Sequence, residues 1–386
     1  MWELVFLLLP VAAYSGWVAG KRHLRSQHKL PLSRDYYRGL NYLLNEQPDK
    51  AMDAFTKMLD VSPDSVETTL ALGSLFRRKG EVERAIGIHQ SLIDRPNLTL
   101  DQRGLSLLEL GQDYLCAGVY DRAENLFYEL SRLGGEPGEK SQKHLLHIFE
   151  REKDWDKAIQ TAKSYQASSM EFMGPQIAQY YCEKAVLSYA QKDVKNALKF
   201  LKNALYHDHA CVRASILQGE FDLDHGRYRS AMKAFKRVEQ QDITFMPEVM
   251  GRIVHIHDIL GLQGALEQYF AHLLRTRPCV TTILAYAKHI EKKFNAEEAA
   301  RFMSEYLKQY PSIRGIAYLI QFHLKRLSGH AREELGLLQT LFEKILTQKP
   351  IYQCQQCGFS LKALHWQCPS CQQWSKVKSI QGVEGE

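Results

Sequence analysis

The feature that most constrains the fold of this chain is a repeat of about 34 residues. Small residues recur at intervals of 34, 38, 35, 39, 34, 34 and 34 residues, at Ala51, Ala85, Ala123, Ala158, Ala197, Ala231, Ala265 and Ala299. A helix–turn–helix unit of this length is typical of tetratricopeptide repeats. Each helix pair has an apolar face that it cannot bury alone, so neighbouring pairs must stack. We therefore predict an all-α array of eight to nine helix pairs over residues 35–349.

Glycine and phenylalanine residues keep the phase of the alanines. Four glycines lie twelve residues before their alanine (Gly39, Gly73, Gly111 and Gly219), and three phenylalanines lie four residues after theirs (Phe55, Phe127 and Phe235). We expect the glycines to mark close helix contacts and the phenylalanines to be buried. The two longer intervals predict insertions near residues 95–102 and 168–176. Residues 314–327 and 332–348 are expected to form a closing pair.

The first twenty residues carry the pattern of a transmembrane helix. Residues 2–20 contain one charged side chain, Glu3. A helix of this length rises about 28 Å, close to the thickness of a bilayer core. We predict an anchor over residues 1–20 and a basic linker over 21–34, which begins with Lys21, Arg22 and Arg25. These cations place the rest of the chain in the cytoplasm, whereas a cleaved signal peptide would carry them before the apolar run.

Four clustered cysteines predict a metal site within residues 350–386. They form two C-x2-C pairs separated by ten residues: Cys354 and Cys357, then Cys368 and Cys371. Two such turns can direct four thiolates at one tetrahedral ion, either iron or zinc. A cytoplasmic location keeps thiols reduced and favours a metal over disulfides. We expect this small domain to dock on the last repeats and close the open end of the array.

Other residues near the metal site and in the array have simpler interpretations. Aromatic residues flank the cysteines and are expected to cover the metal site (Tyr352, Phe359, Trp366 and Trp374). The remaining cysteines are predicted to be small buried hydrophobic residues (Cys116, Cys182, Cys211 and Cys279). The hydrophobic content of 45% and the charged content of 24% fit a soluble array and exclude a polytopic membrane protein.

Charged residues in the array leave two interpretations open. Arg77 and Arg78 belong to the first helix of the second pair, which lines the concave surface of such arrays. They could bind an acidic partner, or they could form a solvated basic face, and charge runs more often have the second role. Asp222 and Asp224 are likewise interpreted as a solvated face.

The sequence contains no recognisable catalytic set, and we predict that the chain is not an enzyme. It lacks a P-loop, a G-x-S-x-G elbow and an H-E-x-x-H zinc motif. Histidines occur in pairs at 144 and 147, 207 and 209, and 255 and 257, but nothing nearby completes a site. A nucleic-acid binder would need a stronger and more clustered positive charge than the net +6 of this chain.

The chain resembles the lipopolysaccharide assembly protein B (LapB) family of Gram-negative bacteria over essentially its whole length. The segments that carry the resemblance are the anchor at 3–13, residues 32–36, the repeat segments at 73–77, 80–86 and 117–124, and the tail at 352–374. The tail resembles the family's rubredoxin-type domain, and its four cysteines match the family's metal ligands one by one.

The resemblance implies a single-pass inner-membrane protein whose bulk faces the cytoplasm. It implies an adaptor for the membrane protease FtsH that promotes degradation of the lipid A deacetylase LpxC. A lipopolysaccharide-sensing membrane protein would antagonise it, and it would gather lipopolysaccharide-assembly proteins at the membrane. The residues that bind these partners and the oligomeric state are not assigned. The alternative function is rubredoxin-like electron transfer, because iron–thiolate centres can be redox active.

Overall fold

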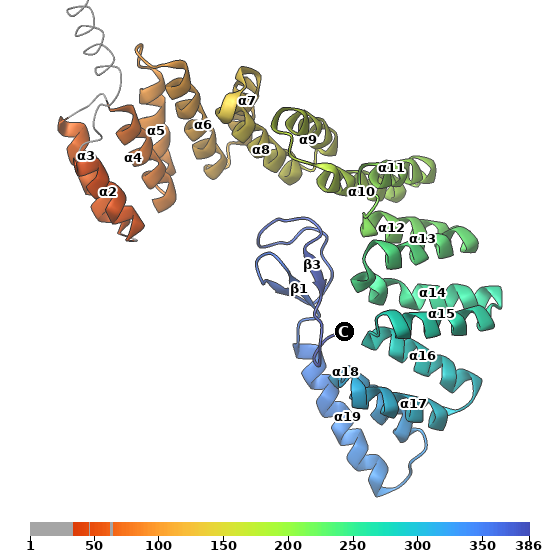
Figure 1. Cartoon of the computed structure of the whole chain (residues 1–386). Helices are drawn as coiled ribbons and strands as arrows, with labels where there is room; N and C mark the ends of the chain where they lie inside the picture. The colour runs from red at the N-terminus through yellow and green to blue at the C-terminus, as the bar shows by residue number, and fades with distance from the viewer. Residues whose placement is uncertain (1–33, 46, 62–64) are drawn as a thin grey trace, which may run out of the picture. The chain divides into compact units, whose positions relative to one another are not determined.

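The computed structural model describes residues 34–45, 47–61 and 65–386 (Figure 1). The predicted anchor at 1–20 and the linker residues Lys21, Arg22 and Arg25 lie outside these residues. Among the described residues, no helix is both long enough and apolar enough to cross a membrane.

The described chain forms two compact units, one ending at Glu152 and the other beginning at Lys153. The first unit contains α2 (Arg34–Leu44), α3 (Pro48–Val61), α4 (Val66–Lys79), α5 (Val82–Ile93), α6 (Leu100–Cys116), α7 (Tyr120–Leu133) and α8 (Gly135–Glu152). The second unit contains α9 (Trp155–Ser169), α10 (Gly174–Ala190), α11 (Val194–His207), α12 (Val212–Asp224), α13 (Tyr228–Gln241), η1 (Ile243–Phe245), α14 (Met246–Leu260), α15 (Gln263–Thr276), α16 (Val280–Lys293), α17 (Ala296–Gln309), α18 (Ile313–Leu324) and α19 (His330–Gln348). These eighteen helices, α2 to α19, confirm the mostly helical repeat array among the residues described.

The glycine and phenylalanine pattern marks close packing between the two helices of a pair. A Cβ atom on Gly111 would lie 2.6 Å from the ring of Phe127, and one on Gly219 would lie 2.4 Å from Phe235. Contacts this short would force the neighbouring ring to move, so these positions need glycine. Both phenylalanines are fully buried, which confirms the prediction for these repeats.

The structure corrects the register of the seventh repeat. In the other aligned repeats, the buried alanine is the fourth residue of the second helix, as Ala231 is in α13. In α15 the fourth residue is Leu266, which is fully buried, whereas Ala265 is exposed. Alanine tolerates either face of a helix, so counting from Ala265 displaced the repeat by one residue.

The first predicted insertion and the closing pair are present in the structure. The connection from α5 to α6, residues 94–99, lies where the first longer interval indicated, and α18 and α19 form the last pair. The second insertion is corrected: the connection from α9 to α10, residues 170–173, is as long as that from α11 to α12, residues 208–211, and the longer interval comes mainly from α10, which has 17 residues.

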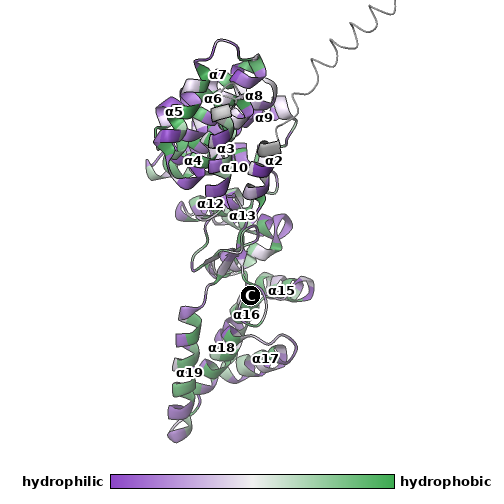
Figure 2. Cartoon of the chain, turned by 90° about the vertical axis from the view of Figure 1, so that its left-hand side faces the viewer, coloured by the Kyte–Doolittle hydropathy of each residue, from purple (hydrophilic) through white to green (hydrophobic). Residues whose placement is uncertain are grey.

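No residue of α19 is buried. Four of its apolar side chains are 44–63% exposed: Leu337, Leu338, Leu341 and Ile345. Figure 2 shows green, the colour of hydrophobic residues, along this helix. This helix therefore contributes little to the core.

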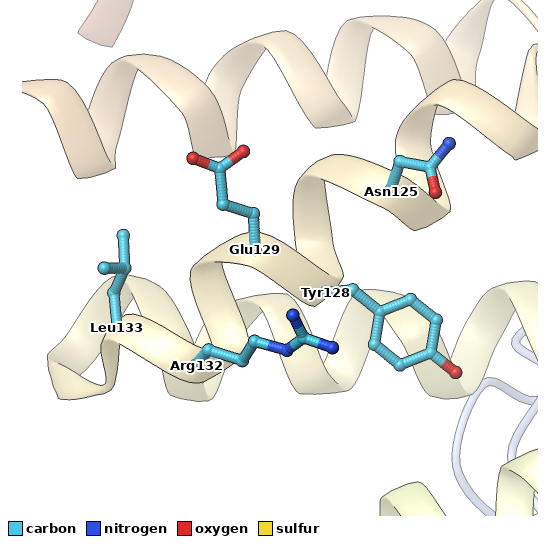
Figure 3. A pocket seen from close by; sticks show the side chains of 5 residues that line it. All are labelled: Asn125, Tyr128, Glu129, Arg132 and Leu133. Carbon is cyan, nitrogen blue, oxygen red and sulfur yellow. The ribbon is translucent and has the colours of Figure 1, made fainter.

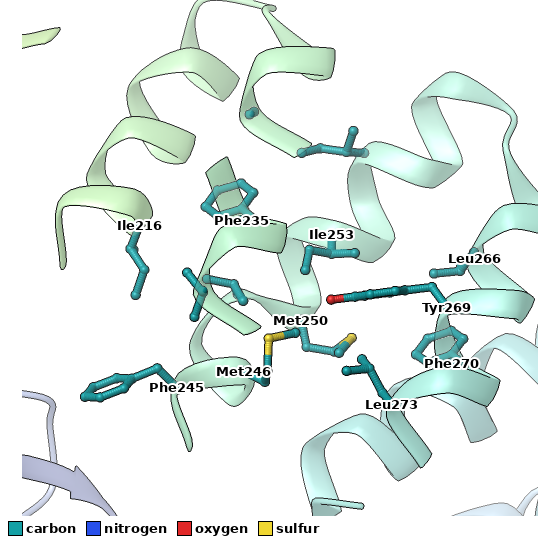
Figure 4. Packing of buried hydrophobic residues seen from close by; sticks show 14 of the residues in the cluster. Ile216, Phe235, Phe245, Met246, Met250, Ile253, Leu266, Tyr269, Phe270 and Leu273 are labelled. Carbon is teal, nitrogen blue, oxygen red and sulfur yellow. The ribbon is translucent and has the colours of Figure 1, made fainter. Parts of the chain in front are cut away.

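The main core of the second unit lies between α12 and α15. Phe235, Met250, Ile253 and Phe270 are all fully buried in one apolar cluster (Figure 4). Trp366, from the C-terminal domain, packs against the edge of the same cluster. The core of the array and the C-terminal domain are therefore continuous.

The C-terminal domain is a small antiparallel sheet in the order β2-β1-β3, which we call the ribbon (residues 350–386). Its strands are β1 (Tyr352–Cys354), β2 (Ser360–Leu361) and β3 (Val377–Ser379). Tyr352 of β1 lies opposite Leu361 on one side and Ser379 on the other. A sheet of such short strands buries little apolar surface, so it needs another source of stability.

The ribbon contacts the second unit from α10 to α18, so docking on the last repeats is confirmed in part, and the expectation that the ribbon only closes the open end of the array is corrected. Figure 1 shows β1 and β3 beside α12 and α14. Hydrogen bonds join Ser375 to Gln179 of α10 at 2.9 Å, and Tyr352 to Glu248 of α14 at 2.7 Å. The last helix pair contacts the ribbon mainly through the C-terminal residues of the chain, including Glu386, which is described below.

Candidate metal centre

The four clustered cysteines meet at one point of the ribbon. Their sulfur atoms all lie within 4.8 Å of one another. The Sγ atoms of Cys354 and Cys371 are 3.7 Å apart, as are those of Cys357 and Cys368. A tetrahedral ion with metal–sulfur bonds of about 2.3 Å would space its sulfurs by about 3.8 Å. The residues present therefore fit a single tetrahedral ion.

Two backbone turns of the same shape aim the sulfurs. In the first turn the N–H of Gly358 donates to the carbonyl of Cys354 at 2.9 Å, and in the second the N–H of Gln372 donates to Cys368 at 2.8 Å. Gly358 has φ +76° and Gln372 has φ +57°. The left-handed conformation costs glycine little, but a glutamine adopts it only where the surroundings hold it there.

Backbone N–H groups near the four cysteines also stabilise the ionised form of their thiols. The N–H of Phe359 points at the sulfur of Cys357 and lowers the pKa of that thiol to about 7. At Cys371 the N–H of Gln373 acts in the same direction, but burial and the neighbouring sulfurs raise the pKa. Four thiols this close cannot all ionise without a cation between them, so the site is built to hold one.

The arrangement leaves no open position for chemistry on a substrate. Four thiolates complete a tetrahedral shell, so a bound ion would hold the ribbon's fold rather than activate a water molecule. Cys354 and Cys368 are buried, whereas Cys357 is exposed. His365 is exposed and does not belong to the group of potential ligands.

Two of the aromatic residues expected to cover the metal instead join the ribbon to the array. The ring of Trp374 lies edge-on to Trp155 and Tyr180, at centroid distances of 6.3 and 6.1 Å. Trp366 stacks on Phe245 at 5.5 Å. Phe359, by contrast, is 44% exposed. Large aromatic surfaces contribute strongly to such interfaces, so the tryptophans anchor the ribbon.

A buried arginine lies between the two tryptophans. The Arg213 guanidinium is 5.8 Å from the ring of Trp366 and 6.0 Å from that of Trp374, and it pairs with Glu183 at 2.8 Å. Arginine is suited to this position because its planar charge can stack on rings while its edge binds a carboxylate. No sequence pattern marked its contacts with the tryptophans, because Trp366 and Trp374 lie far from Arg213 along the chain.

The last residue, Glu386, caps a helix of the array. Its carboxylate accepts hydrogen bonds from the N–H of Thr281 at 3.0 Å and from the Thr281 hydroxyl at 2.6 Å, and it pairs with Arg314. Cys279, at the N-cap of α16, makes no side-chain capping bond. Glu386 therefore supplies the negative charge that a helix N-terminus favours.

The structure corrects the interpretation of Arg77 as a solvated basic residue. Its guanidinium donates to Asp113 at 2.7 Å and to Glu109 at 2.6 Å, and the side chain is 13% exposed. Asp113 is fully buried and also bonds the ring of His89 at 2.5 Å. His89 occupies the position that phenylalanine has in other repeats, against Gly73. This polar chain joins α4, α5 and α6.

Two other predictions about exposure also need correction. Asp222 was expected on a solvated face, but it is 3% exposed and accepts hydrogen bonds from Arg227 and Ser230 at 2.8 and 2.5 Å. Cys116 was expected to be buried and is exposed. The prediction is confirmed for Cys182 and Cys211, whose buried sulfurs are 3.9 Å apart.

A shallow hollow of about 520 Å³ lies on α7 (Figure 3). Its lining comes from one helix face: Asn125, Tyr128, Glu129, Arg132 and Leu133. These residues provide no nucleophile with an adjacent base and no cluster of metal ligands. The hollow therefore does not add a catalytic site to the described chain.

Comparison with known proteins agrees with both parts of this architecture. Residues 352–378 match a family described as a rubredoxin metal binding domain, and residues 68–101 match a tetratricopeptide repeat. Lipopolysaccharide assembly protein B of Escherichia coli (strain K12) is 36% identical over 394 residues, and that of Haemophilus influenzae is 33% identical over 401 residues; each alignment covers 100% of both chains. A crystal structure of MamA aligns with 44% of this chain and 94% of its own, at 19% identity and a TM-score of 0.34.

Proposed function

This chain belongs to the lipopolysaccharide assembly protein B family, and on that premise we propose that it is a membrane-anchored adaptor that regulates lipopolysaccharide synthesis. The adaptor brings an LpxC-type deacetylase to an FtsH-type membrane protease and so shortens the lifetime of the deacetylase. Residues 1–20 hold it in the inner membrane, with the helical array in the cytoplasm.

The similarity to lipopolysaccharide assembly protein B over the full length of both chains carries this proposal. The architecture is suited to an adaptor, because stacked helix pairs offer long surfaces to other proteins. The closed shell of four sulfurs suits a structural ion. Anchoring confines the array near membrane partners and raises their effective concentration. A lipopolysaccharide-sensing membrane protein would regulate the adaptor through its anchor.

The lifetime of the deacetylase in cells tests the proposal. We expect depletion of this protein to prolong that lifetime, and the intact gene to restore rapid turnover. The Cys368→Ser variant should fail to restore it, whereas Cys279→Ser, which changes a cysteine of the array outside the metal site, should restore it fully. An unchanged lifetime after depletion would refute the adaptor function.

Metal analysis and a visible absorption spectrum of the purified protein address the alternative of electron transfer. An iron–thiolate centre that cycles between two oxidation states would favour that alternative, whereas zinc would exclude redox chemistry at this site. Deacetylase turnover sustained by a zinc-loaded protein would support the adaptor.

A further inference from the structure

The first unit contains an open groove with a volume of about 500 Å³, separate from the ribbon. It is formed where α4, α6 and α8 end and α7 begins, and its lining includes Leu115, Tyr120, His144, His147 and Arg151. We propose that this groove binds an acidic peptide segment of a partner protein, with Arg151 as the main carboxylate-binding group. This inference rests on the proposed function, in which the partner is the protein that the adaptor delivers for degradation. It adds the chemistry of the partner segment that binds in the groove.

The lining of the groove is positively charged and contains no carboxylate. Arg77 reaches its edge, but Glu109 and Asp113 already neutralise that guanidinium. Arg151 is different: it is exposed, and its guanidinium lies 5.2 Å from the ring of Tyr120. A ring contact leaves the N–H edge of the guanidinium free to bind a carboxylate through two parallel hydrogen bonds.

The two histidines of α8 add hydrogen-bond donors beside Arg151. His144 and His147 are one helical turn apart and both line the groove. The ring of His144 stacks on Phe127 at 4.9 Å, and burial, followed by the nearby His147, lowers its pKa. A neutral imidazole still carries one N–H donor. Leu115 and the ring of Tyr120 provide apolar contacts for the side chains between carboxylates.

The position of the groove favours a carboxylate over a phosphate. Arg151 lies in the last turn of α8, and Cys116 is the final residue of α6. Helix C-termini carry partial negative charge, and phosphates bind preferentially at helix N-termini. With three helix C-termini against one N-terminus, that of α7 at Tyr120, the site is better matched to a singly charged carboxylate held by a guanidinium than to a phosphate with a greater charge. The lining extends over α4, α6 and α8, the first helices of three successive pairs, and this extension suits a peptide chain.

Peptide binding to the full-length protein in detergent micelles tests the inference. The probe is a fluorescent, end-blocked seven-residue peptide of alternating glutamate and leucine, and its match has glutamine in place of glutamate. We expect the glutamate peptide to bind in a salt-dependent manner and the glutamine peptide to bind at least tenfold more weakly. Arg151→Gln should weaken binding of the glutamate peptide by about tenfold, the loss of one charge-assisted pair.

Arg132→Gln is the matched control, because Arg132 is an exposed arginine in the last turn of α7 and does not line the groove. It should leave peptide binding unchanged. Equal binding of the two peptides, or equal losses from the two variants, would overturn the inference. Displacement of the peptide by inorganic phosphate at equal concentration would also overturn it, because the site would then select phosphate.

Deacetylase lifetime separates this inference from the proposed function. Arg151→Gln should prolong the lifetime and Arg132→Gln should not. If depletion prolongs the lifetime but Arg151→Gln does not, the groove is not the client site and the inference fails while the adaptor function stands. If depletion has no effect, the adaptor function fails, and the peptide titration alone decides whether the groove binds acidic segments.

Discussion

The two units of this chain differ in what lies against the first helices of their pairs. In the second unit, Trp366 and Trp374 of the ribbon pack against the array and enclose Arg213 between them. In the first unit, the ends of α4, α6 and α8 leave an open groove of about 500 Å³. Similar repeats thus support two outcomes: one surface is occupied by the chain's own metal domain, and another is exposed to solvent.

The two units also differ in the kind of buried contact that links their helices. In the first unit, a polar chain of His89, Asp113 and Arg77 links successive helices. In the second, an apolar cluster between α12 and α15 extends to Trp366, beside the ion pair of the buried Arg213 with Glu183. The stability that a buried ion pair contributes depends on its geometry and on the presence of every partner, whereas the stability from apolar contacts depends on the apolar area that is buried. The units should therefore respond differently to loss of the metal, to added volume and to acid.

Loss of the metal should have the largest effect, and mainly on the second unit. Cys368→Ser, or removal of the ion by a chelator, should unfold the ribbon, because structural zinc contributes about 10–16 kcal/mol to the folding of small metal domains. Amide exchange should then rise in β1, β3 and the parts of α10 and α12 that face the ribbon, and remain unchanged in α4 and α6. Mass spectrometry of hydrogen exchange measures both regions in one sample.

Cys116→Ser is the control for this experiment and should retain both the metal and the protection. A ribbon that stays protected in Cys368→Ser without metal would show that docking, rather than the ion, maintains its fold. Equal loss of protection in α4 and α6 would contradict the separate responses of the two units.

Added volume at a helix contact should have an intermediate effect in the first unit. Gly111→Ala places a methyl group 2.6 Å from the ring of Phe127 and should destabilise this unit by about 1–3 kcal/mol, the usual cost of overpacking. Gly251→Ala in α14 is the matched control, because no atom beyond the adjacent residues and backbone of its own helix lies within 4 Å of the added Cβ. It should be neutral or stabilise by up to about 1 kcal/mol. Urea unfolding of each variant measures the difference.

Equal stabilities for Gly111→Ala and Gly251→Ala would mean that the ring of Phe127 moves aside without cost. The close packing deduced from the glycine pattern would then be wrong for this repeat.

The repeats and the metal ligands were predictable because their signals are local or periodic. The glycine at 111 and the phenylalanine at 127 contact each other within one pair, so the same spacing recurs wherever that contact is made. The cysteine spacing fixes two turns that need only local geometry. Ala265 misled the alignment because a small residue fits both faces of a helix, and only burial identifies Leu266 as its equivalent.

The sequence carries a signal for the ion pair of Arg77. Its partners Glu109 and Asp113 lie 32 and 36 residues further along the chain, about one repeat away. Lys292 and Asp258 pair in the same way across 34 residues, at 3.0 Å. Opposite charges one period apart on stacked helices are therefore candidates for pairing, and Arg77 with Glu109 and Asp113 meets this criterion.

Docking of the ribbon had no comparable signal. Its contacts join residues far apart in the sequence, such as Tyr352 with Glu248, 104 positions apart, and Ser375 with Gln179, 196 positions apart. These separations follow no period, and each partner is an ordinary residue of its own helix or strand. A tryptophan beside a cysteine looks the same in the sequence whether it covers the metal or an adjacent surface. The site of docking therefore had to come from the structure.

Acid should have the smallest effect, through the ion pair of Lys378 and Asp242 at 2.7 Å. Burial raises the pKa of Asp242, but hydrogen bonds from Lys378 and Thr244 outweigh it and hold the pKa below its ordinary value. A depressed folded-state pKa gives stability that is present above the unfolded value near 4 and is lost as pH falls through the folded value. The free energy of unfolding of the wild type should therefore exceed that of Asp242→Asn by less than about 1 kcal/mol at pH 7, and this difference should vanish towards pH 3. Urea unfolding of the second unit at pH 7, 5 and 3.5 measures this difference, and protonation of the thiolates affects the wild type and the variant alike.

The control is Asp49→Asn, which removes an exposed ion pair with Lys79 in the first unit. It should leave the stability of the second unit unchanged. A difference that persists at pH 3.5 would show that Asp242 acts through its hydrogen bonds to Thr244 rather than through its charge.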